Sequence, residues 1–218
     1  MQPTLPRRNR GLSQLELLLV LAILGILGVL AVGELKTLSR RTKTEEAVRG
    51  LADMFNGVAA HFNEQRPDYG APDLPSLPSL PSLPSLPSHR CPHPVDQPFA
   101  GEQPPTPPLD LRCADGPGGR CTPRQGADGP GTYDLTEWTQ NPVWQGMNFR
   151  HTGGHHFHYS YSFRNIATPD GHGACEFTVR ATADLDGDGV WSVYERGGFA
   201  ERTGVNADAG LRIQNPLE

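Results

Sequence analysis

Residues 11–32 read GLSQLELLLVLAILGILGVLAV, an almost unbroken apolar run near the start of the chain. From Leu12 to Val32 a helix would measure about 31 Å at about 1.5 Å per residue, which matches the apolar thickness of a bilayer. Glu16 is the only ionisable residue in the run. Because a lone carboxylate in a membrane costs several kcal/mol, the run predicts a membrane-spanning helix whose glutamate meets a positive charge from another chain.

Charged residues are distributed unevenly along the 218-residue chain, whose formal net charge is -5. Residues 67–218 contain 18 acidic residues against ten arginines and no lysine. An acidic surface repels phosphate backbones, so this part of the chain argues against nucleic acid as a partner and favours cations.

A short basic leader, MQPTLPRRNRG, precedes the apolar run and ends on Gly11. Counted from Leu12, Glu16 is the fifth residue after that glycine. This arrangement resembles the N-terminus of the type IV pilins and pilin-like proteins, which include the pseudopilins of type II secretion. The resemblance implies that prepilin peptidase cleaves after Gly11 and N-methylates Leu12. It also implies that Glu16 pairs with the Leu12 amine of a neighbouring subunit during assembly.

The resemblance further implies a location and a set of partners. The subunit would first lie in the bacterial inner membrane as a single-pass protein with its N-terminus inside, and later in a cell-surface pilus or a periplasmic pseudopilus. Its partners would be other pilin subunits, in a homo- or hetero-oligomeric filament, together with prepilin peptidase and the assembly machinery of the inner membrane. Phenylalanine is the commoner first mature residue, and Gly33 stands where many major pilins have proline. The choice between major pilin, minor pilin and pseudopilin therefore stays open, with a minor pilin or pilin-like protein favoured.

Two other classes of function are consistent with the sequence. One is a secreted calcium-binding module released by signal peptidase near Gly33. The other is a pilus-tip adhesin or DNA-uptake subunit built on the same scaffold. The chain has no GxSxG, HExxH or GxxxxGK motif, so we expect a structural subunit and not an enzyme.

The helical pattern continues beyond the apolar run and becomes amphipathic. Five apolar residues recur at alternating spacings of three and four: Val48, Leu51, Phe55, Val58 and Phe62. Such spacing forms one apolar stripe on a helix, and Pro67 and Gly70 end the pattern. We therefore expect one helix over about residues 13–65. Its half over 12–33 would span the membrane and form the filament core, and its half over 34–66 would be amphipathic.

Residues 67–130 are rich in proline and glycine. They include LPSLPSLPSLPSLPS, residues 74–88, whose regularly spaced prolines favour an extended polyproline II tether. Four cysteines lie beyond the apolar run, as expected of a protein that folds in an oxidising compartment: Cys91, Cys113, Cys121 and Cys175. Four cysteines allow three pairings. We favour Cys113 with Cys121, closing a short glycine-containing loop, and Cys91 with Cys175, tying the loop region to a following sheet.

Strand patterns are concentrated in residues 131–218. HHFHYSYSF, residues 155–163, alternates aromatic and polar residues and predicts a half-buried strand whose aromatic side faces the helix. CEFTVRATA, residues 175–183, predicts a second, antiparallel strand. His156 and His158 share the polar side of the first strand, which we interpret as a solvent-exposed face and not as a metal site. The expected fold class is α+β, with a long N-terminal helix packed on a small antiparallel β-sheet head that carries long Pro/Gly-rich loops.

DLDGDGVWSVYE, residues 184–195, matches a calcium-loop pattern: D-x-D-x-D-G, then five residues and a glutamate. The predicted ligands are four carboxylates, one backbone carbonyl and one hydroxyl: Asp184, Asp186, Asp188, Glu195, Val190 and Ser192. Because a strand-like run and not a helix precedes the loop, we expect an isolated structural calcium loop beside a sheet. A plain acidic turn is the alternative.

Overall fold

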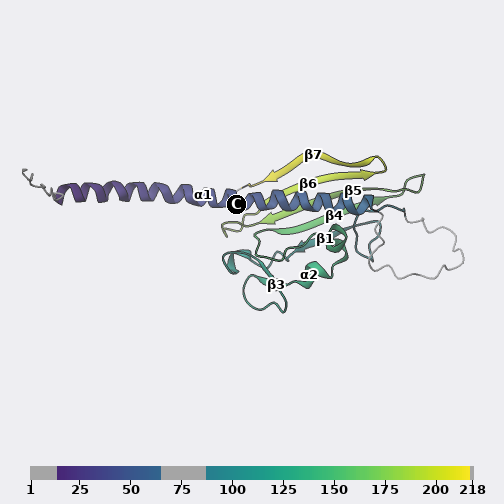
Figure 1. Cartoon of the computed structure of the whole chain (residues 1–218), viewed down its shortest axis with the longest axis horizontal. Helices are drawn as coiled ribbons and strands as arrows, with labels where there is room; N and C mark the ends of the chain where they lie inside the picture. Colours follow the sequence, from purple (N-terminus) through teal and green to yellow (C-terminus); the bar gives the residue numbers. More distant parts are fainter. Residues whose placement is uncertain (1–13, 65–86, 217–218) are drawn as a thin grey trace, which may run out of the picture. The chain divides into compact units, whose positions relative to one another are not determined.

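The computed structural model describes residues 14–64 and 87–216 (Figure 1). The leader over residues 1–11 and most of the LPS repeat lie outside the described residues. The chain divides into two compact units, residues 1–41 and residues 42–218.

The long helix α1 runs over Gln14–Asn63, close to the predicted bounds. Its residues up to Arg41 belong to the first unit. Among the residues that the structure describes, we find no helix with the length and apolar character needed to cross a membrane. The span expected over residues 12–33 extends beyond the residues whose side chains are described.

In the second unit, α1 contributes an apolar stripe to the core of the head. Its buried apolar residues are Ala47, Leu51, Met54, Phe55, Val58 and Phe62. The prediction was wrong for Val48, which is exposed; Ala47 takes its place because it lies one turn before Leu51 on the same face.

Five strands form one antiparallel sheet in the order β1-β4-β5-β6-β7. The strands are β1 (Ala100–Thr106), β4 (His158–Ile166), β5 (Ala174–Ala183), β6 (Ser192–Glu201) and β7 (Gly204–Gln214). The strand predicted over 175–183 is confirmed as β5, which pairs with β4 through partners such as Phe163 and Phe177. The strand predicted over 155–163 begins three residues later, because His155 instead pairs with Cys121 in an isolated bridge.

The second half of α1 packs on one face of this sheet (Figure 1). The rings of Phe55 and Phe177 lie 5.2 Å apart, and Gly198 leaves room for both of them. Tyr159 occupies the space beside Gly50 of the helix, so the aromatic side of β4 faces α1 as predicted. The α+β class and the packing of the helix on an antiparallel sheet are therefore confirmed.

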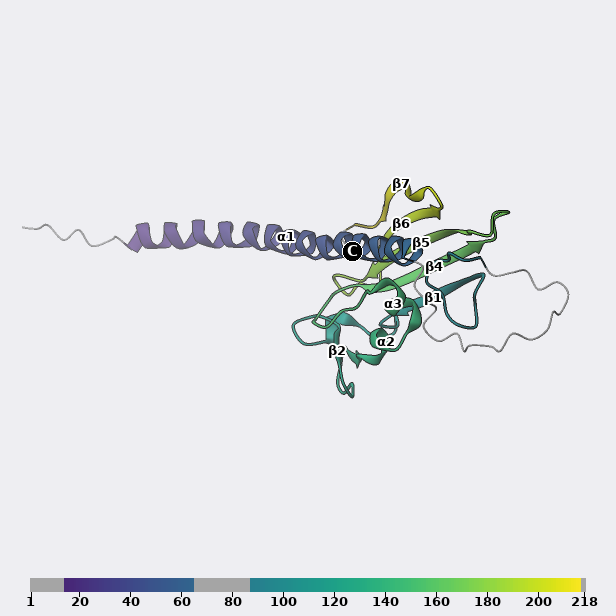
Figure 2. The same cartoon turned by 45° about the vertical axis from the view of Figure 1, so that its right-hand side comes forward.

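Short elements complete the head beside β1 (Figure 2). They are η1 (Cys113–Asp115), β2 (Thr122–Arg124), β3 (Thr132–Asp134), α2 (Thr136–Thr139) and α3 (Pro142–Met147). β2 and β3 form a parallel pair. α3 begins at Pro142 because the Asn141 side chain accepts the free N–H groups of the first turn.

Two disulfides join the irregular segment to the rest of the head. Cys91 is bonded to Cys175 of β5, and Cys113 is bonded to Cys121 eight residues later. This is the pairing that the sequence favoured. Both bonds restrict the unfolded chain, which stabilises a segment with little regular structure.

Candidate functional site

The first unit presents an apolar helix with Glu16 in its first turn. Leu15 and Leu17 on either side of it are 76% and 52% exposed. The exposed large apolar residues of this unit are Leu15, Leu17, Leu18, Leu19, Val20, Leu21, Ile23, Leu24, Ile26, Leu27 and Leu38. Exposed apolar surface of this extent marks an interaction site with protein or lipid. Gly11 and Leu12, the predicted cleavage and methylation residues, lie outside the described residues.

The acidic loop, residues 184–191, connects β5 to β6. Carboxylate oxygens of Asp184, Asp186 and Asp188 lie within 4.8 Å of one another. Asp184 holds the turn, because its Oδ1 accepts the backbone N–H of Gly187 at 2.7 Å. Gly187 has a φ of 81°, which a residue without a Cβ adopts at little cost.

Glu195, the predicted closing ligand, is not brought to this triad. It lies in β6 opposite Arg180 of β5, whose Nε donates to its Oε1 at 2.6 Å. Its Oε2 lies 3.8 Å from Nη1 of Arg212 in β7. In a calcium-binding helix–loop–helix, the twelfth residue returns to the ion on the following helix; here a strand continues away from the loop.

Ser192 and Val190, the two remaining predicted ligands, each make a hydrogen bond in or beside the loop. The buried Ser192 hydroxyl donates to the Asn215 carbonyl, just after β7, at 2.6 Å. The Val190 N–H donates to Asp188 at 2.7 Å within the loop. Of the four predicted carboxylate ligands, the structure therefore brings together the three aspartates and not Glu195.

The loop is attached to the head through Leu185, whose side chain is buried and whose carbonyl accepts from Lys43 of α1 at 3.3 Å. The three carboxylates fit a hard divalent ion such as calcium, which prefers carboxylate oxygens and completes its shell with water.

The histidines of the β4 region are not on an exposed face, contrary to the prediction. His156 donates its backbone N–H to Glu46 Oε1 at 2.7 Å, and its ring Nδ1 lies 2.8 Å from Glu46 Oε2. Burial alone would raise the pKa of Glu46, but the hydrogen bonds from His156 lower it below the usual value. Sequence reasoning missed this pair because its members are 110 residues apart.

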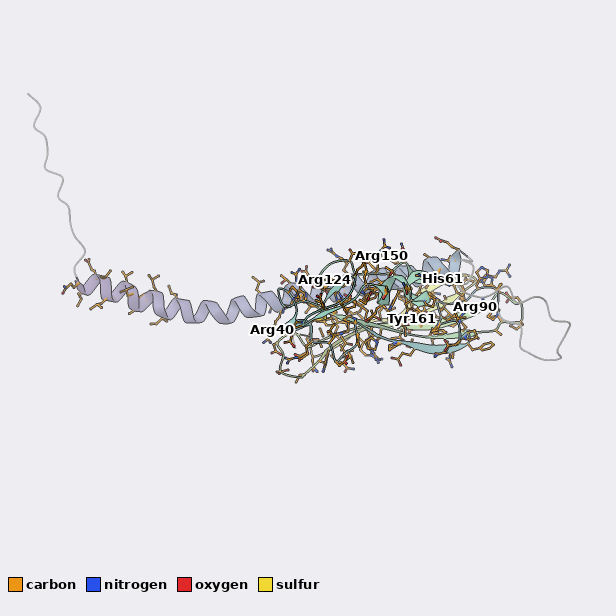
Figure 3. All side chains as sticks on the ribbon, turned by 90° about the horizontal axis from the view of Figure 1, so that it is seen from below. Arg40, His61, Arg90, Arg124, Arg150 and Tyr161 are labelled. Carbon is orange, nitrogen blue, oxygen red and sulfur yellow. A yellow bond between two sulfur atoms is a disulfide. The ribbon has the colours of Figure 1, made fainter. Side chains whose placement is uncertain are left out.

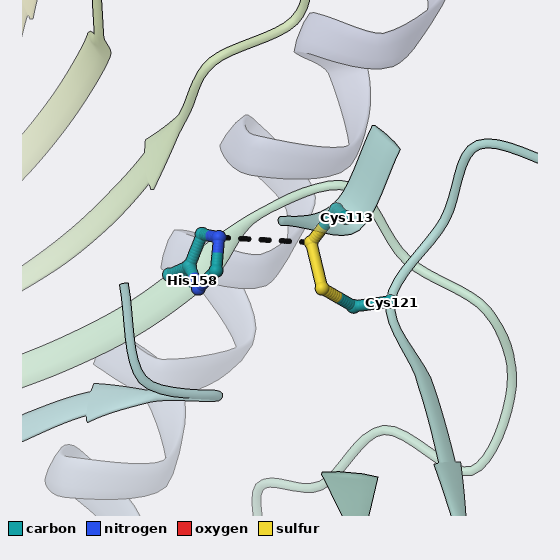
Figure 4. Close-up of side chains that lie close together, drawn as sticks. All are labelled: Cys113, Cys121 and His158. Atoms are coloured by element: carbon teal, nitrogen blue, oxygen red, sulfur yellow. Dashed lines mark hydrogen bonds between the residues drawn. A yellow bond between two sulfur atoms is a disulfide. The ribbon is translucent and has the colours of Figure 1, made fainter. Parts of the chain in front are cut away.

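His158 is buried beside the Cys113–Cys121 disulfide (Figure 4). Its Nδ1 lies 2.8 Å from the Pro107 carbonyl oxygen, and its Nε2 lies 3.6 Å from Cys113 Sγ. Burial lowers the pKa of His158, which favours the neutral ring. The three side chains come from separate segments and form a cluster of possible metal ligands.

A buried chain of hydrogen bonds joins three further side chains that no sequence motif indicated. Trp138 Nε1 donates to the Tyr133 hydroxyl at 2.5 Å, and that hydroxyl lies 2.6 Å from His155 Nε2. Burial raises the pKa of Tyr133 and lowers that of His155, so both groups are neutral at physiological pH. The chain satisfies buried polar atoms and fixes the contact between α2 and the start of β4.

Several of the described arginines of the head are paired with acidic side chains. Figure 3 shows Arg90 well separated from Arg124 and Arg150. Five arginines each lie within 4.0 Å of an acidic side chain: Arg112 with Asp115, Arg164 with Glu176, Arg180 and Arg212 with Glu195, and Arg202 with Asp170.

Comparison of the chain with models of known protein families, with curated proteins and with solved structures finds no match.

Proposed function

We propose that this chain is a structural subunit of a type IV pilus or a related filament, as a minor pilin or pilin-like protein. The observation that carries the proposal is the division of α1. Its first part exposes apolar side chains and holds Glu16 in its first turn, whereas its second part is a core element of an antiparallel head. A helix with these two roles suits a subunit whose N-terminal part attaches it to a membrane or a filament. The C-terminal part of the same helix then belongs to the core of a folded head.

In this proposal the apolar part of α1 first anchors the subunit in the bacterial inner membrane. It then packs among the same helices of neighbouring subunits, where Glu16 pairs with the methylated amine of Leu12. Prepilin peptidase and the assembly machinery of the inner membrane act on the subunit before it reaches a surface pilus or a periplasmic pseudopilus. The two disulfides support a head that folds in an oxidising compartment.

The three aspartates of the acidic loop are part of the proposal as a structural calcium site. Bound calcium would offset the repulsion among carboxylates that lie within 4.8 Å of one another.

The proposal is tested by the mature N-terminus. The full chain is produced in a bacterial host with and without a prepilin peptidase, and its first peptide is determined by mass spectrometry from membranes and from sheared surface material. We expect an N-methylated Leu12 only with the peptidase. A Gly11→Val variant should keep its leader, because the resemblance to the pilins places Gly11 at the cleavage position.

A different start would contradict the proposal. A mature chain that begins near Glu34, in both the presence and the absence of the peptidase, would identify a secreted protein released by signal peptidase. Cleavage of Gly11→Val at an unchanged rate would equally exclude processing at Gly11.

A further inference from the structure

We infer that Cys113, Cys121 and His158 bind a zinc-class metal ion when the Cys113–Cys121 disulfide is reduced. The two Sγ atoms and a ring nitrogen of His158 lie within 4.8 Å of one another, and all three residues are buried (Figure 4). Two thiolates and one imidazole are ligands that zinc prefers in proteins, and water takes the fourth position in open sites. The inference is independent of the proposed filament function.

The orientation of His158 suits a metal ligand. The Pro107 carbonyl, 2.8 Å from Nδ1, can only accept a hydrogen bond, so Nδ1 carries the proton. In the neutral ring the lone pair is then on Nε2, which faces Cys113 Sγ at 3.6 Å. Metal-binding histidines are commonly held in this way, with the second ring nitrogen donating to a backbone carbonyl.

In the oxidised protein, the atom that faces this lone pair is a disulfide sulfur, which has no hydrogen to donate. In the reduced protein, Nε2 faces a thiol or a metal ion held by the two thiolates.

The cavity and the loop next to the disulfide leave space around the two sulfur atoms. A cavity of about 30 Å³, which is space for one water, adjoins Cys113 and His158; its other lining side chains include Arg112, His156, Asp184 and Trp191. The loop between the cysteines contains glycines at 118 and 119, and no atom lies within 4 Å of an added Cβ at either one. At these two positions, an added side chain would therefore meet no neighbouring atom.

The chemistry balances with a dithiol as the reductant. The dithiol gives two electrons and two protons to the Cys113–Cys121 bond and becomes a disulfide itself. Zn²⁺ then displaces the two thiol protons, forming two Zn–S bonds and one Zn–N bond to His158.

Alkylation of the reduced full chain tests the inference, and the other cysteine pair provides an internal control. The chain is purified in detergent, reduced, freed of reductant without oxygen, and treated briefly with N-ethylmaleimide with and without Zn²⁺. Peptide mapping then measures the rate at each cysteine. We expect zinc to slow modification of Cys113 and Cys121 at least about tenfold, and to leave Cys91 and Cys175 unchanged, because zinc-bound thiolates are shielded.

Two histidine variants identify the nitrogen ligand. His158→Gln should reduce the protection at least about tenfold, because one of three protein ligands is lost. His172→Gln, at a histidine that stacks on His89 and does not line this cavity, should keep the protection. Equal protection of all four cysteines, no protection of any, or full protection in His158→Gln would overturn the inference. A reduced chain that no longer folds would give no selective protection and would overturn it as well.

Discussion

At the scale of the residue, the Glu46–His156 pair is the clearest case of a charge held by its surroundings. One carboxylate accepts both the backbone N–H and a ring nitrogen of His156, at 2.7 and 2.8 Å. The pair joins α1 to the segment just before β4, two parts of the head that are far apart in sequence. A carboxylate that accepts several hydrogen bonds stays ionised at a lower pH than usual.

Replacing this carboxylate should make the stability of the head less dependent on pH. The folded-state pKa of Glu46 lies below its ordinary value of 4.5, so its contribution is present above that pH and is lost as the pH falls through the folded pKa. Glu46→Gln should therefore lower the unfolding free energy by about 1 kcal/mol near neutral pH and by less in acid. Thermal melts across this pH range measure the difference. Glu45→Gln, an exposed neighbour, serves as the control, and parallel profiles for wild type and Glu46→Gln would show that the pair has no such role.

At the scale of the element, α1 approaches the rest of the head closely at its glycines. A Cβ on Gly57 would overlap the Met147 carbonyl oxygen at the end of α3. Backbone atoms of α3 cannot move aside as a flexible side chain can. Glycine at 57 therefore permits the close contact between α1 and α3. This contact explains why a residue of low helix propensity stands inside a helix.

Gly57→Ala should lower the unfolding free energy of the head by about 1–3 kcal/mol, because overpacking costs more than the gain in helix propensity. Gly25→Ala is the matched control on the same helix, since nothing lies within 4 Å of its added Cβ. Denaturant titration of both variants provides the comparison. A Gly57→Ala chain as stable as the control would mean that α1 does not contact α3 this closely.

The acidic loop permits a test of whether calcium binds to the three aspartates alone or to the full sequence motif, which includes Glu195. If calcium binds the aspartate triad, a chelator should lower the melting temperature of the head. When calcium is initially present at about a hundred times its dissociation constant, its removal should cost about 2.7 kcal/mol of stability. Asp186→Asn should weaken this response, whereas Glu195→Gln should keep it, because Glu195 contacts Arg180 and Arg212 instead of the triad. An unchanged melting temperature on chelation would rule out the calcium site. A response lost in Glu195→Gln would favour the motif over the observed geometry.

At the scale of the whole molecule, the proposed filament depends on the apolar part of α1. Glu16→Ala should leave membrane insertion unchanged but reduce incorporation into filaments at least about tenfold, because breaking a buried charge pair costs about 3 kcal/mol or more. Leu18→Ala, a loss of exposed apolar surface without a loss of charge, is the control. Sheared filaments from cells that produce each variant are quantified by immunoblot. Equal incorporation of Glu16→Ala and Leu18→Ala would contradict the pairing of Glu16 with Leu12.

Features that depend on neighbours in the chain were readable from the sequence. The apolar run, the stripe over residues 48–62 and the following Pro67 and Gly70 predicted a helix over about residues 13–65, of which the structure describes Gln14–Asn63; the pattern of residues 175–183 placed β5 within one residue of its ends. Both periodicities arise from backbone geometry, which is local. The preference for Cys113–Cys121 also followed from a short separation along the chain.

Features that depend on distant residues could be known only from the folded chain. His156 and His158 look exposed in an alternating strand, yet Glu46 and Pro107 cover them from other segments. Glu195 completes a calcium pattern along the sequence, yet strand pairing sets it against Arg180. Local periodicity determines which element forms, but the environment of a polar side chain depends on which segments pack against that element, and these contacts arise only when the whole head folds.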